Sequence, residues 1–199
     1  MANNNLPRFS FFCFLITISI FLSSILYQTT AIIESDDKHK NTSKNRNKHK
    51  LLTQKLSHFT FYWHDKVSGL KPTSIPIITP NISQTGFGMV TMIDNALTEG
   101  PDSTSKELGR AQGLYGQASL DNIKLIMMMN FVFTTGKYNG SSITIMGSNS
   151  VFDKVREMPV IGGSGLFRFA HGYAQARTNT FNLKTGDAVV KYDVYVMHY

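Results

Sequence analysis

The sequence has almost no cysteine: Cys13 is the single thiol among 199 residues, and it lies in an apolar N-terminal run. A single cysteine excludes an internal disulfide framework and a thiolate metal site. The stability of the folded part must then come from a hydrophobic core, with oligomerisation as a second source.

Motifs for metals, nucleotides and hydrolysis are absent as well. The six histidines are scattered, and His39 and His49 lie in a basic stretch near the N-terminus. No HExxH, GxSxG or GxxxxGK[ST] string occurs, and the glycine cluster at 162–165 does not have GxGxxG spacing. We therefore predict no metal and no cofactor, and we interpret the glycine cluster as a tight turn.

Net positive charge is small outside the N-terminal quarter of the chain. The formal net charge is +7, but more than half of it lies within residues 1–50, where we interpret the basic run at 44–50 as a flexible, solvated tail. A nucleic-acid-binding surface would need a basic stripe interleaved with aromatic residues, and the rest of the sequence has none. We predict no nucleic-acid partner.

The N-terminus has the pattern of an export signal. A short start with Arg8 precedes an apolar run at 9–26 and small residues that end at Ala31. We predict a signal peptide over residues 1–31. An uncleaved membrane anchor is the alternative, because the apolar run is nearly long enough to span a bilayer. Residues 32–50 would form a flexible basic linker, and the mature protein would be secreted, with no stable membrane span.

Three Asn-X-Ser/Thr sequons fit an exported protein. They begin at Asn41, Asn81 and Asn139. Such triplets also arise by chance, but together with a signal peptide they predict a surface glycoprotein. Asn81 and Asn139 should then lie in exposed loops.

From Leu56 onward, short β-like runs alternate with Gly, Pro, Asn and Asp, so we predict one domain over residues 51–199. The spacing is typical of an all-β sandwich or barrel. Turn signals at 139–140 and 185–187 indicate hairpins and antiparallel neighbours, while residues 97–106 are predicted to form a loop. The predicted strands are 56–64, 73–79, 86–93, 110–118, 123–135, 141–147, 166–178 and 188–198.

Strand parity gives the first indication of a site. Phe59, Phe61 and Trp63 share one face of the first predicted strand, and Asp65 continues the same series. A carboxylate at the end of an aromatic face must be paired, hydrogen-bonded or protonated with a raised pKa. The alternative, which the sequence leaves open, is that Asp65 caps a turn at 68–69.

A second predicted strand has little side-chain volume on one face. Gly109, Ala111 and Gly113 share the face that carries Tyr115. In a barrel interior, such space is either filled by large side chains from facing strands or left as a ligand cavity. The sequence leaves both readings open.

Several strings, in this order along the chain, resemble those of plant dirigent proteins, and the resemblance covers residues 56–199. It implies an eight-stranded antiparallel β-barrel, assembly as a homotrimer and export to the cell wall space, the apoplast. The strings are FYWHD at 61–65, LTEGP at 97–101, GRAQGLY at 109–115, FVF at 131–133, YNGS at 138–141 and REMPVIGGSGLFR at 156–168.

The resemblance also implies a function. Dirigent proteins bind phenoxy radicals that a separate laccase or peroxidase makes from monolignols such as coniferyl alcohol. They orient the radicals so that coupling gives optically active lignans. Such a protein need not oxidise anything, because orientation alone biases the competing couplings. The first hypothesis is therefore a non-oxidising auxiliary protein of lignan biosynthesis and phenylpropanoid metabolism.

Residue by residue, the resemblance assigns a pocket. Asp65 matches the aspartate of the HD motif and would act as acid or base on a quinone methide. Tyr115, which ends RAQGxY, and Arg156, from the R-[DE]-hydrophobic motif, would hydrogen-bond phenolic or methoxyl oxygens. The further residues expected to contact the bound molecule are Phe61, Trp63 and Asn149.

One position departs from the family pattern. Lignan-forming relatives carry a second aspartate in a Met-Gly-Ala-Asp string, whereas this chain reads MGSN at 146–149. Asn149 can donate and accept hydrogen bonds but cannot transfer a proton at ordinary pH. A second hypothesis is therefore a dehydratase: relatives that are pterocarpan synthases dehydrate isoflavanols through a quinone methide, for which one acid suffices. The third is a wall-associated phenolic-binding protein of plant defence.

Overall fold

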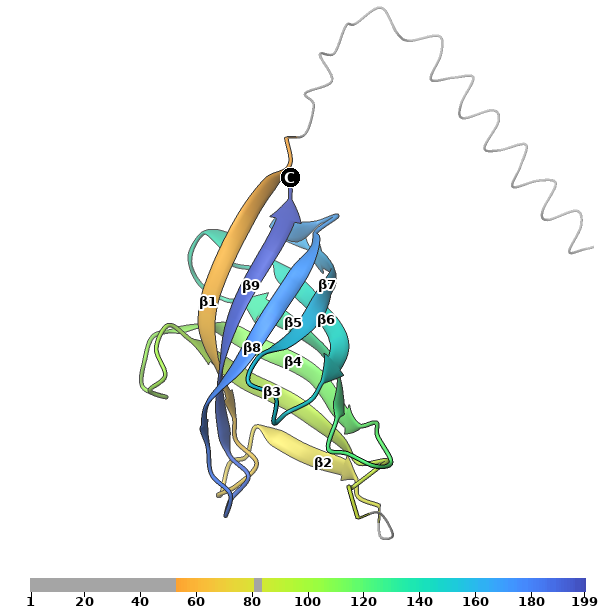
Figure 1. Ribbon diagram of the computed structural model, residues 1–199. Helices are drawn as coiled ribbons and strands as arrows, with labels where there is room; N and C mark the ends of the chain where they lie inside the picture. Colours follow the sequence, from red (N-terminus) through yellow and green to blue (C-terminus); the bar gives the residue numbers. More distant parts are fainter. Residues whose placement is uncertain (1–52, 81–83) are drawn as a thin grey trace, which may run out of the picture. The chain divides into compact units, whose positions relative to one another are not determined.

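The chain forms nine β-strands, β1 to β9, in a computed structural model that describes residues 53–80 and 84–199. All nine belong to one antiparallel sheet (Figure 1). Two short 3₁₀ helices, η1 (Gly136–Tyr138) and η2 (Gly165–Phe167), lie in the connections. The strand bounds are β1 Lys55–Asp65, β2 Ser74–Ile78, β3 Val90–Thr98, β4 Glu107–Gln117, β5 Leu125–Phe133, β6 Ser142–Asn149, β7 Arg156–Ser164, β8 His171–Phe181 and β9 Ala188–His198.

The sheet closes into a barrel through β3, which has two partners along one edge. Its first half pairs with β2, where Ser74 lies opposite Ile93, and its second half pairs with β1, where Tyr62 lies opposite Thr98. The other strands follow in the order β1-β9-β8-β7-β6-β5-β4-β3. The prediction of an all-β, eight-stranded antiparallel barrel is confirmed, and β2 is a short ninth strand beside β3.

The structure corrects the prediction that the glycine cluster at 162–165 forms a tight turn. Gly162 and Gly163 lie within β7, which the sequence did not predict, and only Gly165, with φ +60°, begins the turn η2. A Cβ on Gly163 would lie 2.5 Å from the Ser142 carbonyl oxygen of β6. Glycine is needed there because two strands approach closely, not because the chain turns. The strand predicted to start at 166 begins at His171 instead.

One face of β4 has little side-chain volume, and at two of its glycines the reason is again the close approach of a neighbouring strand. A Cβ on Gly109 would lie 2.0 Å from the Val132 carbonyl oxygen, and one on Gly113 would lie 2.2 Å from the Met128 carbonyl oxygen. The backbone of β5 therefore occupies the space that these glycines leave. The reading of this face as an open cavity does not hold at these two residues.

Aromatic side chains fill one end of the barrel and its middle. Four rings at the end lie 5.0 to 6.0 Å apart between centroids. In the next layer, Phe131 lies 4.9 Å from Phe61 and 5.3 Å from Tyr192, and all three are almost completely buried. This end of the interior is therefore closed by packing. The four rings are those of Phe59, Phe133, Tyr138 and Phe167.

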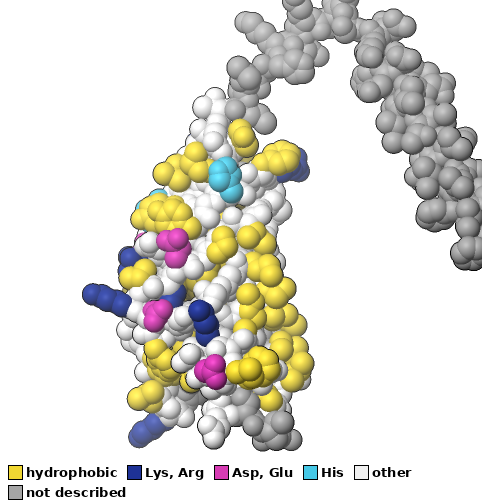
Figure 2. Space-filling view, turned by 45° about the vertical axis from the view of Figure 1, so that its right-hand side comes forward, with side chains coloured by type: hydrophobic (Ala, Val, Ile, Leu, Met, Phe, Trp, Pro, Cys, Tyr) yellow, Lys and Arg dark blue, Asp and Glu magenta, His cyan; other side chains and the backbone are white. Residues whose placement is uncertain are grey.

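The outer surface carries an apolar row that runs across five strands. Its members are exposed or half-buried and face one another as direct pairing partners. Figure 2 shows hydrophobic side chains gathered along one side of the barrel. Soluble monomers seldom expose large apolar patches, so this row is a candidate surface for self-association. The row consists of Ile75, Met92, Leu114, Met128 and Met146.

Several sequence predictions lie outside the described residues: the signal peptide over 1–31, the linker over 32–50, and the sequons at Asn41 and Asn81. Asn139 is described, and it is exposed between η1 and β6, as predicted for a sequon loop. Among the described residues, no helix is long and apolar enough to cross a membrane.

Truncation of Phe131 tests the packed layer. Phe131→Ala should lower the free energy of unfolding by about 3–5 kcal/mol, because it removes a fully buried ring and leaves a cavity among neighbours that can relax only partly. Urea denaturation of the purified domain measures the change. Ile161→Ala, on the exposed face of β7, should change it by less than about 0.5 kcal/mol. Equal losses in the two variants would contradict a core inside the barrel.

Candidate functional site

A cavity of about 520 Å³ opens at the end of the barrel opposite the aromatic cluster. The ends of seven strands, β1 and β4 to β9, contribute to its lining, together with the β6–β7 connection. This volume lies within the range of small-molecule sites. The structure brings five of the six residues predicted to form the pocket into the lining: Trp63, Asp65, Tyr115, Asn149 and Arg156.

The sixth predicted residue lies elsewhere. Phe61 does not line the cavity but packs in the layer beneath it, with its ring against Phe131. Inward-facing positions two residues apart lie at successive depths in the barrel. Trp63 therefore lines the floor of the cavity, and Phe61 lies one layer deeper. The shared face was predicted correctly, while its depth could not be read from the sequence.

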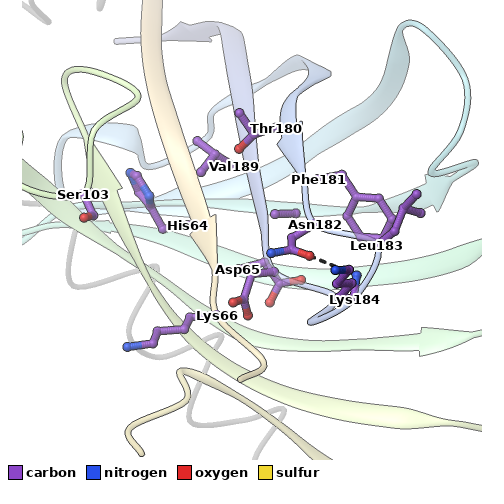
Figure 3. Close-up of a pocket in the computed structure, with 12 residues that line it drawn as sticks. His64, Asp65, Lys66, Ser103, Thr180, Phe181, Asn182, Leu183, Lys184 and Val189 are labelled. Atoms are coloured by element: carbon purple, nitrogen blue, oxygen red, sulfur yellow. Dashed lines mark hydrogen bonds between the residues drawn. The ribbon is translucent and has the colours of Figure 1, made fainter. Parts of the chain in front are cut away.

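A second, more open hollow of about 800 Å³ lies beside the first (Figure 3). It runs between the end of β1 and the β8–β9 hairpin, where Figure 3 shows Asp65 near Asn182 and Lys184. The two hollows share Asp65, Phe181 and Ala188. The predicted polar residues converge in the smaller one, which we therefore take as the candidate site.

The Asp65 carboxyl group ends the inward face of β1 and is held by three neighbours. Ser74 Oγ donates a hydrogen bond to Oδ1, and Tyr115 OH donates to Oδ2 at 3.3 Å. The Asn95 amide lies 3.4 Å from Oδ1, and 3.0 to 3.1 Å from the Ser74 hydroxyl. Burial raises the pKa of Asp65 above its ordinary value, although these hydrogen bonds oppose the shift, and Asp187 adds a smaller increase. Asp65 thus keeps its proton to higher pH than a free aspartate.

The turn-cap alternative for Asp65 is excluded, because another carboxylate takes that role. Asp187 Oδ1 accepts hydrogen bonds from the amides of Val67 and Ser68, at 2.9 and 3.0 Å. Its Oδ2 accepts one from Ser68 Oγ at 2.6 Å. These bonds lower the pKa of Asp187, with that from the Ser68 hydroxyl the strongest. The carboxyl of Asp65 is therefore free to face the cavity.

Tyr115 remains a neutral hydrogen-bond donor beside Asp65. Burial of its ring, followed by the nearby charge of Asp65, raises the pKa of the phenol well above its ordinary value. The ring is almost completely buried and reaches the cavity from β4. Tyr115 is therefore an uncharged phenol whose O–H is donated to the Asp65 carboxyl group.

Two buried polar atoms of the lining have no partner. These atoms are Arg156 Nε and Asn149 Oδ1. Within residues 53–80 and 84–199, every other buried side-chain nitrogen or oxygen atom has a hydrogen-bond partner. Arg156 uses its Nη1 to donate to Val151 O at 2.9 Å and to Thr178 Oγ1 at 2.6 Å. An unpaired buried polar atom costs about 1–3 kcal/mol. The two atoms are enclosed within the lining of the cavity, and each lacks the partner that would offset this cost.

Burial also lowers the pKa of the Arg156 guanidinium, and the nearby Tyr192 and Asp153 oppose this shift. An arginine remains protonated at ordinary pH, so Arg156 adds a buried positive charge to the lining, where Lys154 is exposed. Within the described residues, no three His, Cys, Asp or Glu side chains are grouped as a metal site would require. The groups available for chemistry are a carboxyl, a phenol, an amide and a guanidinium.

Ser74, Asn95 and Thr178 belong to the site but were not predicted. Thr91, Ile93 and Asn95 are buried on the same face of β3, at a spacing of two residues. The alternation would have predicted Asn95 as an inward-facing residue, but the predicted strand ended at 93. Ser74 and Thr178 gave no such signal, because their roles depend on which strands become neighbours.

The fold and site define a class of protein: an antiparallel β-barrel whose open end forms a small-molecule cavity with one buried carboxyl group. Residues 56–197 match the model of the family described as Dirigent-like protein. The chain belongs to the dirigent family.

Curated relatives extend this assignment. Dirigent protein 21 of Arabidopsis thaliana is 53% identical over 147 residues, which cover 72% of this chain and 78% of the relative. Dirigent protein 11 of the same plant is 41% identical, covering 92% and 94%. Pterocarpan synthase 1 of Glycyrrhiza echinata is 43% identical over 150 residues, covering 73% and 80%.

A solved structure is similar as well. That of the pterocarpan synthase dirigent protein GePTS1 matches with a TM-score of 0.71 and 42% identity, covering 74% of this chain and 87% of that one.

Asp65 should leave a signature in the pH dependence of stability. A folded-state pKa above the unfolded value contributes stability at low pH that is lost as the pH rises through the folded pKa. The Asp65→Asn side chain cannot ionise. The melting temperature of this variant minus that of the unchanged protein should therefore rise from about pH 4 upward. Thermal melts across the pH range measure this difference. A difference that stays constant with pH would contradict a buried, protonated carboxyl.

Proposed function

We propose that this dirigent protein controls the stereochemistry of a phenolic intermediate, with Asp65 as the acid. Specifically, it would dehydrate an isoflavanol-like phenol through a quinone methide, as pterocarpan synthases do. The observation that carries this proposal is the half-buried carboxyl group of Asp65, placed across the cavity from the neutral Asn149. The other carboxyl in the lining, Asp153, is exposed at the rim.

The cavity groups match the proton transfers of such a reaction. The Asp65 O–H would protonate the leaving hydroxyl, the C–O bond would break with its electron pair, and water would depart. The phenol conjugated to that carbon would lose its proton to solvent water at the open end of the cavity and become the carbonyl of the quinone methide. An internal hydroxyl would then add to the carbon, returning one proton to Asp65, while the carbonyl oxygen regains the other. The sum is loss of one water, with no oxidant.

The two unpaired atoms are enclosed by the lining, so a bound molecule would reach them only after the two side chains shift. In that arrangement they would suit the phenol oxygen, which changes from a hydroxyl to a carbonyl. Asn149 Oδ1 can accept a hydrogen bond from the phenol O–H of the substrate. Arg156 Nε–H can donate to the same oxygen once it becomes a carbonyl, in a buried position where a charge-assisted hydrogen bond is strong. Stereochemical control would follow because only one face of a planar intermediate so held is open to attack.

A second candidate is control over the coupling of monolignol radicals made by a separate laccase or peroxidase. The similarity to curated dirigent proteins, 53% identical for Dirigent protein 21, supports it. Here the cavity would orient two radicals, and Asp65 would assist ring closure of the coupled quinone methides. The absence of a second acid at position 149 weighs against this reaction. Binding of phenolics in defence without product control is the remaining alternative.

Removal of the acid tests the function. Asp65→Ala should lower the turnover of a racemic isoflavanol, without oxidant, by at least about 100-fold, because general acid catalysis contributes about that much. Chiral chromatography of the products measures the rate and the enantiomeric excess. Asp94→Ala, which removes an exposed carboxylate from the outer face of β3, is the matched control and should keep the activity.

The same samples, assayed with coniferyl alcohol and laccase, separate the candidates. Enantiomeric excess in this assay alone would establish coupling instead of dehydration. Unchanged products from a folded Asp65→Ala protein would remove Asp65 from either mechanism.

The cellular setting follows the same proposal. A protein acting on phenolic intermediates beside a laccase or peroxidase would be exported to the apoplast as a glycoprotein. The apolar run at 9–26 and the exposed sequon at Asn139 support export. Self-association as a homotrimer is supported by the apolar row on the outer surface.

A charge within that row tests self-association. Met128→Glu should convert the oligomer to monomer, because a carboxylate at the centre of an apolar interface would be desolvated without a partner. Light scattering after size-exclusion chromatography measures the mass. Gln175→Glu, on the outer face of β8, should leave the mass unchanged. An intact oligomer in Met128→Glu would place the interface elsewhere.

A further inference from the structure

Asp187 links two segments that border Asp65. It precedes β9 directly, and the first residue of β9, Ala188, is the pairing partner of Asp65 on β1. Its carboxylate reaches across to the turn that follows β1 and accepts the three hydrogen bonds from Val67 and Ser68. The end of β1 is thus tied to the β8–β9 hairpin just beyond the acid.

The tied turn also carries a direct partner of the acid. Lys66 O accepts hydrogen bonds from the amides of Thr73 and Ser74, at 2.8 and 3.0 Å, so the turn closes on itself. It thereby places the Ser74 hydroxyl against Asp65 Oδ1. The position of that hydroxyl depends on the conformation of the turn that Asp187 fixes.

On the other side, the hairpin forms the wall between the two hollows. Gly186 lines the cavity, while Ala188 and Phe181 line both hollows. The hairpin packs closely on the turn, since a Cβ on Gly186 would lie 3.0 Å from Val67 Cγ2. Its own loop is ordered by the Asn182 side chain, which accepts a hydrogen bond from the amide of Lys184 (Figure 3). The amide of Thr185 donates to the same side chain.

We propose that Asp187 is a positioning residue for Asp65: its carboxylate latches the β8–β9 hairpin to the β1–β2 turn, and so fixes both the acid and the cavity wall beside it. The role in turnover rests on the proposed function. The positioning itself does not, because it can be measured without substrate.

The negative charge of Asp187 gives this latch a second, measurable effect. It repels the ionised form of Asp65 and so contributes to the raised pKa of that carboxyl. Tyr115 is the other titratable group that acts on Asp65. The further charged or titratable residues of the two hollows are retained in every variant below: His64, Lys66, Asp153, Lys154, Arg156 and Lys184.

The experiment combines two measurements on the full folded domain. In Asp187→Ala, amide exchange at Val67 and Ser68 should become at least about tenfold faster, because both amides lose a charge-assisted hydrogen bond. The carboxyl carbon of Asp65, followed by NMR, should titrate at lower pH, since the repelling charge is gone and water gains access. Asp187→Asn keeps an acceptor oxygen but not the charge, so it should lower the titration midpoint while protecting the amides better.

Glu99→Gln, which removes a carboxylate from an exposed ion pair with Lys106, is the control and should change neither measurement. An unchanged Asp65 titration in Asp187→Ala, or unchanged exchange at both amides, overturns the proposal. If Asp187→Ala does not fold, the titration in Asp187→Asn decides. In Asp187→Ala, the kcat for isoflavanol should fall by a larger factor than the change in KM. Should the unchanged protein dehydrate nothing, the proposed function fails while the exchange and titration results still decide the role of Asp187.

Discussion

The burial of one carboxyl group at the boundary between a packed core and an open cavity is the constraint on which this structure depends. Aromatic rings fill the interior up to the level of Phe61 and Tyr192, and Trp63 follows on β1. Asp65, the next inward residue, is therefore half-buried beside the open cavity. An isolated carboxylate there would be costly. The protein meets this cost with a raised pKa and three neutral hydrogen-bonding neighbours rather than with a counter-ion.

The barrel makes this arrangement possible because its two ends differ. At one end, four rings and the buried His198 close the interior. At the other, the strand ends present Asp65, Tyr115, Asn149 and Arg156 to one cavity. Packing supplies stability where the interior is closed, and the two unpaired buried polar atoms found among the described residues belong to the cavity lining. A scaffold divided in this way can change its chemistry through a few residues at its open end.

Asn149 illustrates how a single position can redirect the reaction. With an acid there, the cavity would hold two groups able to transfer a proton; with the amide, it holds one and an unsatisfied acceptor. Under the proposed function, the residues at the open end of the cavity would select among reactions of phenolic molecules. The similarity to both dirigent proteins and a pterocarpan synthase is consistent with such a selection.

The sequence by itself determined the strand periodicity, the inward face of β1 that carries Trp63 and Asp65, and, through resemblance, the family and most of the pocket. These are local properties, because side chains alternate along a strand whatever its partners are. Only the tertiary structure decided that Phe61 lies beneath the cavity, that Gly162 and Gly163 belong to a strand, and that Ser74, Asn95 and Asp187 surround the acid. Their roles arise from strands and turns brought together by barrel closure, which no local pattern records.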